Sequence, residues 1–255
     1  MTAPVGTSPS SSSDIPLRII SGIFWAIIGI AIVLALAIVL LSSNVFLAIS
    51  NYLQIIAAIA GAIAFVYAYY RYGRPDCLLY AAGAFGLWGA SNSAWYVNTI
   101  LGRRNEVFPG LIDIGIIASI LILTVAYQHA FPRKRVAGKI LLGILAFAFI
   151  VPLAILMTTG ISLPTLMTFL YFFACGSLLI IGLIHSLGEY PLILTGTLLF
   201  AIAFMIYPIR ETFFLANPFL NVIGVFVFSG LSLIVIGLIP ACKKIASIAS
   251  TVNIP

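Results

Sequence analysis

The chain has 255 residues, of which 63% are hydrophobic and 7% are charged, and its formal net charge is +6. Soluble domains carry about 25% charged residues, so this composition excludes a water-soluble globular fold and predicts a surface that faces lipid. The basic residues lie in short turns between apolar runs and not in one stripe, which argues against a nucleic-acid partner.

The N-terminal segment differs from the rest of the chain. Residues 1–16 are small, polar and rich in serine and proline, which predicts a disordered tail. The apolar run after Arg18 is about 24 residues long, whereas the apolar core of a signal peptide has roughly 7–15 residues. We therefore expect this run to remain as the first membrane span.

Eight apolar runs follow one another, each close to the roughly 20 residues that cross a bilayer as a helix. The sequence therefore predicts an all-α, polytopic membrane helix bundle of about eight transmembrane helices. Its single transmembrane domain would cover residues 17–242, and a short cytoplasmic tail would cover residues 243–255. The predicted spans are residues 17–41, 45–70, 77–101, 108–131, 138–159, 163–187, 190–214 and 218–241.

The basic residues predict the orientation of these spans. Nine of them fall on the side of the N-terminus and three on the other side. Because Lys and Arg are enriched in cytoplasmic loops, we expect a plasma-membrane protein with both termini in the cytoplasm. The first side holds Arg18, Arg71, Arg74, Arg133, Lys134, Arg135, Lys139, Lys243 and Lys244, and the second side holds Arg103, Arg104 and Arg210.

A weak similarity links the two halves of the chain. Pro109 and Gly115 recur as Pro218 and Gly224, each 109 residues later. Parallel repeats of this kind occur in transporter folds, so a four-plus-four parallel repeat is one hypothesis. Chance similarity between two apolar sequences is the other.

Residues 88–113 are the polar exception in this apolar chain and indicate a candidate ligand-binding site. Helical spacing puts polar residues of the third, fourth, seventh and eighth spans at one outer level of the bundle. Because an unpaired charge inside a span is costly, we expect an ion pair between Asp113 and Arg210. The alternative is an aromatic belt with a structural ion pair. The candidate residues are Asn92, Trp95, Asn98, Asp113, Tyr207, Arg210, Glu211 and Asn221.

The two histidines indicate a second, weaker candidate site. His129 and His185 lie at the ends of the fourth and sixth spans, on the same predicted side. Two opposed imidazoles in a bundle can ligate a b-type haem. A solvated histidine at a helix end is the alternative.

Residues 208–214, with the sequence PIRETFF, loosely resemble the Pro-x-Glu-Glu run of membrane lycopene cyclases. In that family a carboxylate protonates a polyene, so the resemblance implies an acid role for Glu211. Arg210 stands where the family has the first glutamate, and only these few residues match. No catalytic residue is assigned from it.

The three cysteines give no site from sequence. Cys77, Cys175 and Cys242 are far apart along the chain and form no CxxC pair, so they predict neither a disulfide framework nor a metal centre. Cys175 lies in an apolar run and is expected to pack as a small hydrophobe.

Three hypotheses about function follow. The first is a non-enzymatic binder or carrier of a small or amphiphilic molecule at the outer polar site, without a cofactor. The second is a structural or accessory subunit, with the bilayer and either other membrane proteins or further copies of this chain as partners. The third is a b-type cytochrome or a membrane enzyme acting on a lipid or isoprenoid.

The predicted topology can be tested by cysteine labelling in a cysteine-free background. Asn105→Cys is expected to react with a membrane-impermeant maleimide in intact cells, because it lies on the predicted outer side. Lys134→Cys is expected to react only after the membrane is opened. The reverse pattern, or equal labelling of both positions, would overturn the eight-span topology.

Overall fold

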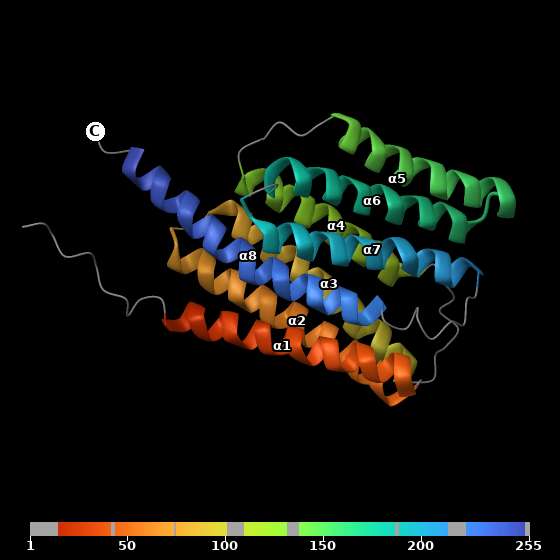
Figure 1. Cartoon of the computed structure of the whole chain (residues 1–255), viewed down its shortest axis with the longest axis horizontal. Coiled ribbons are helices and arrows are strands. Elements are labelled where there is room, and N and C mark those ends of the chain that lie inside the picture. Colours follow the sequence, from red (N-terminus) through yellow and green to blue (C-terminus); the bar gives the residue numbers. More distant parts are fainter. Residues whose placement is uncertain are drawn as a thin grey trace, which may run out of the picture.

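The structure of the chain is a computed structural model, which describes residues 15–41, 44–73, 75–100, 110–131, 138–186, 189–213 and 223–252. Within these residues it contains eight α-helices and no strand (Figure 1). The all-helical fold predicted from the apolar runs is confirmed for these residues. The helices are α1 Ile15–Leu41, α2 Asn44–Arg71, α3 Asp76–Ile100, α4 Leu111–Ala130, α5 Gly138–Thr159, α6 Leu163–Ser186, α7 Pro191–Phe213 and α8 Ile223–Val252.

The helices form a bundle with α8 at its centre. α8 contacts α7, α2 and α1, whereas α5 lies at the edge and packs mainly on α6 (Figure 1). In the most apolar stretch of α8, 83% of the residues are buried, against 11% in that of α5. A helix that is apolar on all sides is either enclosed by other helices or surrounded by lipid. α8 is enclosed by other helices, whereas most of α5 is exposed on the outside of the bundle.

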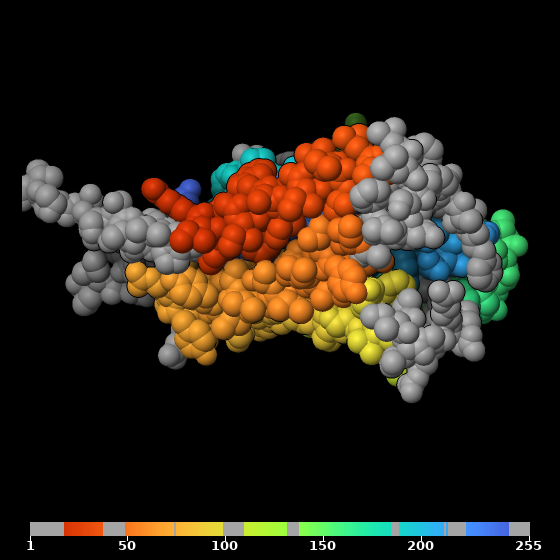
Figure 2. Space-filling model, turned by 90° about the horizontal axis from the view of Figure 1, so that it is seen from below, coloured from red at the N-terminus to blue at the C-terminus, as the bar shows by residue number. Residues whose placement is uncertain are grey.

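The face formed by α1 and α2 has the apolar surface that lipid requires. The two helices lie side by side over this face, with α3 along its edge (Figure 2). Ile23, Ile30, Ile56 and Ile63 are exposed large side chains on these two helices. Since such a surface would be unstable in water, it is consistent with a helix bundle that faces hydrocarbon.

Seven of the described helices are long and apolar enough to cross a membrane, which supports a membrane-embedded, multi-pass protein. The exception is α3, which has 25 residues and contacts α2 and α4 along the bundle. Its C-terminal half carries Ser91, Asn92, Ser93 and Asn98, which lower its hydropathy. The structure therefore supports a helical bundle with seven helices that can cross a membrane. That α3 makes an eighth crossing stays a prediction.

The helix ends differ in detail from the predicted spans. α8 continues through Lys243 and Lys244 to Val252, so residues that were predicted as a polar tail are helical. The end of α8 projects past the other helices in Figure 1. Residues 1–14, most of the predicted N-terminal tail, lie outside the described residues.

Two glycines let α7 and α8 approach closely. A Cβ atom on Gly230 would lie 2.7 Å from the carbonyl oxygen of Gly196 and 2.9 Å from the backbone nitrogen of Phe200. Both distances are shorter than a carbon atom tolerates. Because lipid gives no hydrophobic drive for helix association, close contact between small residues stabilises this pair of helices.

Substitution of Gly230 tests this contact. Gly230→Leu is expected to lower the free energy of unfolding by at least about 1–3 kcal/mol, because the two backbones must separate. The measurement is thermal unfolding of the purified protein in detergent. The matched control is Gly143→Leu on α5, where nothing lies within 4 Å of an added Cβ. Equal loss of stability in both variants would contradict the proposed role of Gly230.

Candidate functional site

Asp113 is a buried carboxylate in the first turn of α4, with 5% of its surface exposed. Its Oδ2 accepts a hydrogen bond from the backbone N–H of Gly110 at 2.8 Å, and its own N–H bonds to the Gly110 carbonyl at 3.1 Å. The N-terminus of a helix carries partial positive charge, which favours an acidic side chain in this position. The local sequence Gly-Leu-Ile-Asp thus fixes the carboxylate at the start of α4.

Two tyrosines from other helices complete the hydrogen bonding of Asp113. The hydroxyl of Tyr171 on α6 donates to Oδ1 at 2.7 Å, and the hydroxyl of Tyr207 on α7 donates to the same oxygen at 3.3 Å. Tyr171 is fully buried and Tyr207 is half-buried. The carboxylate therefore joins α4 to α6 and α7.

Aromatic rings surround these hydroxyl groups. The ring of Phe204 is stacked on Tyr171, with centroids 6.0 Å apart and planes within 1° of parallel. Tyr207 meets Tyr171 edge to face at 5.6 Å, and Trp88 on α3 meets Phe204 edge to face at 6.2 Å. We refer to Trp88, Tyr171, Phe204 and Tyr207 as the aromatic cluster.

Trp88 adds an unusual feature to the aromatic cluster. The residue is 1% exposed, and its indole Nε1 has no hydrogen-bond partner among the described residues. Buried polar groups in proteins are nearly always paired, and an unpaired donor costs roughly 1–3 kcal/mol. The cluster thus holds one buried donor that another polar group can use.

The predicted ion pair between Asp113 and Arg210 is wrong. The ion pair in this region joins Nε of Arg210 to Oε1 of its neighbour Glu211 at 3.9 Å, and both side chains are half-buried near the end of α7. Arg210 remains partly hydrated there, whereas the buried carboxylate of Asp113 takes hydrogen bonds from neutral donors.

The remaining predicted residues are less closely connected to Asp113. The side chain of Asn92 donates to the carbonyl of Trp88 at 3.1 Å, so its amide is used within α3. Trp95 is 41% exposed and does not belong to the buried cluster, and Asn98 is half-buried. Asn221 lies outside the described residues.

Tyr171 is the site residue that sequence reasoning missed. It lies among apolar residues of α6, and no spacing rule connects it to Asp113, which is 58 positions away. The available signal was the phenol itself, because a hydroxyl in the middle of an apolar span requires a partner.

The structure gives no support to the haem hypothesis. His129 is exposed near the end of α4, and its ring lies 5.1 Å from that of Tyr80 on α3. The side chain of His185 lies outside the described residues. In the described part of the chain, no three His, Cys, Asp or Glu residues are grouped as a metal site.

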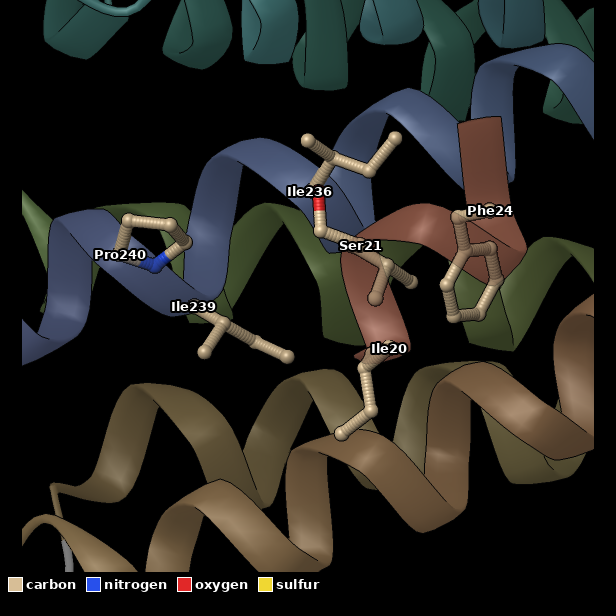
Figure 3. Close-up of a pocket in the computed structure, with 7 residues that line it drawn as sticks. Ile20, Ser21, Phe24, Ile236, Ile239 and Pro240 are labelled. Atoms are coloured by element: carbon tan, nitrogen blue, oxygen red, sulfur yellow. The ribbon is translucent and has the colours of Figure 1, made fainter. Parts of the chain in front are cut away.

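A groove between α1 and α8 is a separate feature. It has a volume of about 50 Å³ and lies beside Ile20, Ser21 and Phe24 of α1 (Figure 3). Ser21 is its one polar side chain, and the α8 side is apolar. Asp113, Tyr171 and Tyr207 are not among its lining residues. The groove is small and has no charged group to recognise a polar molecule.

Neither a family model, nor a curated protein, nor a solved structure matches the chain.

Removal of the two phenolic hydroxyls tests the structure of the site. Tyr171→Phe is expected to lower the free energy of unfolding by about 1–3 kcal/mol, because the buried carboxylate loses a donor. Tyr207→Phe is expected to cost less, because its bond is longer and the residue is half-buried. Unfolding in detergent measures both.

The control is Tyr67→Phe, which removes a hydroxyl from an exposed tyrosine of α2. It should change the unfolding free energy by no more than about 0.5 kcal/mol. If Tyr171→Phe behaves like this control, the bond to Asp113 does not contribute to stability.

Proposed function

We propose that this membrane protein binds a small amphiphilic molecule with a positively charged end, for which Asp113 is the counterion. One observation carries the proposal. Asp113 is buried, and its hydrogen-bond partners among the described residues are Gly110, Tyr171 and Tyr207, all electrically neutral. If its carboxylate is ionised, as we propose, the site holds a negative charge that no cation of the described residues contacts.

Electrostatics favours a role for the Asp113 carboxylate in binding a cationic ligand over a purely structural role. An isolated charge in a low-dielectric interior is costly, and neutral donors reduce that cost without cancelling the charge. The ion pair that Arg210 makes is with Glu211, at 3.9 Å, and not with Asp113. A cation from outside the chain would complete the site.

The aromatic cluster favours the same class of ligand. The faces of Tyr and Trp rings attract cations, and rings around a carboxylate are a common way to hold an ammonium group. Trp88 Nε1 offers a donor for a carbonyl, ether or hydroxyl oxygen on the same ligand. An apolar tail of the ligand would remain among the surrounding helices and lipid.

The location of the site is part of the proposal. Asp113 lies at the start of α4, and the distribution of basic residues predicts that this end faces the outer leaflet. We infer that α3 crosses the membrane as well, because it packs between α2 and α4 and its 25 residues span about 37 Å.

Helix contacts support the proposed four-plus-four repeat. α4 packs on α6, and its counterpart α8 packs on α2, which is the counterpart of α6. In both cases the first turn of the last helix of one half, α4 or α8, contacts polar side chains of the other half. Asp113 meets Tyr171, and Gly224 lies against Ser50 and Gln54. This arrangement is expected if two similar halves are joined around an axis through the bundle.

A second candidate is the accessory-subunit role, which one feature of α5 favours. α5 packs mainly on α6 and carries exposed large side chains, including Leu142, Phe147, Ile150 and Met157. A protein partner or a second copy of the chain would bury this face. Stoichiometric co-purification of a partner that is lost after Phe147→Ala and Ile150→Ala would favour this role over ligand binding.

The binding proposal is tested with a matched pair of probes. A medium-chain alkyltrimethylammonium ion is expected to raise the melting temperature of the purified protein, and the uncharged alcohol of the same chain length is not. A ligand at about 100 times its dissociation constant stabilises by about 2.7 kcal/mol. Asp113→Asn should abolish the shift, and Glu211→Gln should retain most of it.

Two outcomes would overturn the proposal. Equal shifts from the ion and the alcohol would indicate that the protein responds to the hydrocarbon chain alone. An unchanged response in a folded Asp113→Asn variant would indicate that the cation binds elsewhere. Size-exclusion chromatography of each variant establishes that it remains folded.

A further inference from the structure

Two of the three cysteines meet at the opposite end of α3 from the polar residues of the candidate site. The Sγ atoms of Cys77 and Cys242 are 2.8 Å apart, although 165 positions separate the residues in the sequence. Cys77 lies in the first turn of α3 and Cys242 in the last part of α8, and both are buried free thiols. The sequence did not indicate this contact, because the three cysteines form no CxxC motif and lie far apart along the chain.

We propose that Cys77 and Cys242 are an oxidative modification site, in which a small, uncharged hydroperoxide converts the two thiols to a disulfide. One thiol loses its proton, and the thiolate attacks a peroxide oxygen and breaks the O–O bond. The leaving hydroxide takes up that proton, so this step gives a sulfenic acid and one water. The second thiol then displaces a second water, and the S–S bond forms. The net reaction consumes two thiols and one hydrogen peroxide and produces one disulfide and two waters.

The geometry favours this reaction at one pair of cysteines. A disulfide bond is about 2.05 Å long, so the two sulfur atoms need to approach each other by less than about 1 Å. Cys77 also lies at the N-terminus of α3, where the helix favours the thiolate that reacts. Cys175 is fully buried on α6, and its expected role as a small hydrophobe fits that position.

The surroundings of Cys77 and Cys242 determine which oxidants can reach the two thiols and what a disulfide between them would do. Both thiols belong to the apolar core, so a small uncharged peroxide reaches them more easily than a charged thiol reagent. Next to Cys242, the Nζ atom of Lys243 lies 5.6 Å from the centre of the Tyr72 ring, near the end of the bundle. α3 and α8 touch at few positions, so the disulfide would add a covalent link between helices that otherwise contact each other little.

The test counts free thiols in the full-length protein. The folded protein is treated with hydrogen peroxide, the peroxide is removed, and the protein is denatured and labelled with a maleimide of large mass. Reduced protein should take up three labels, one for each cysteine. Oxidised protein should take up one label, on Cys175, and recover three after treatment with dithiothreitol.

Cysteine variants and mass spectrometry show which two cysteines form the disulfide. Cys175→Ala should change from two labels to none, whereas Cys77→Ala should keep two labels with or without peroxide. A peptide pair containing Cys77 and Cys242 should appear in a non-reducing digest of the wild-type protein, so the test does not depend on the folding of any variant. The oxidised wild-type protein should also melt at a higher temperature.

Three results would overturn the inference. The first is retention of all three labels after peroxide. The second is a disulfide that includes Cys175. The third is sulfenic or sulfinic acid at Cys77 without a link to Cys242. None of these measurements involves Asp113, so their outcome is independent of the proposed cation site.

Discussion

The structure around α4 depends on one constraint, the burial of a carboxylate in a bundle that faces lipid. Asp113 is buried and shielded from water, so its oxygens need hydrogen-bond partners within the protein. Gly110 satisfies one oxygen from the same helix, and Tyr171 and Tyr207 satisfy the other from two further helices. This set of bonds fixes the start of α4 against α6 and α7, and none of its donors among the described residues is a cation.

The helices and the level of the site were predictable from sequence, whereas its contacts were not. Long apolar runs define membrane helices because the bilayer thickness sets their length. The order of the helices then put Asp113 and Tyr207 at the same end. Tyr171 and the Cys77–Cys242 pair depend on which helices are neighbours, and here α4 packs on α6 and α3 meets α8. In a chain with apolar residues on every helix face, periodicity gives no such information.

The prediction of an ion pair between Asp113 and Arg210 is wrong for a physical reason. The expectation for Asp113 and Arg210 assumed that a charge in a span needs an opposite charge. Phenol and amide donors met the hydrogen-bonding requirement of the carboxylate, and Arg210 stayed partly hydrated beside Glu211. Hydrogen bonding and neutralisation of charge are separate requirements in a membrane interior. The site satisfies the first from its own residues, and in our account a cationic ligand satisfies the second.

The central claim is that Asp113 is an ionised carboxylate, and infrared spectroscopy tests it most directly. The difference spectrum between the ligand-free wild-type protein and Asp113→Asn isolates the vibrations of this side chain. Our account predicts the symmetric and antisymmetric stretching bands of a carboxylate that accepts hydrogen bonds. A carbonyl band of a protonated carboxylic acid in the wild-type protein at neutral pH would contradict it, because a neutral Asp113 does not require a cation.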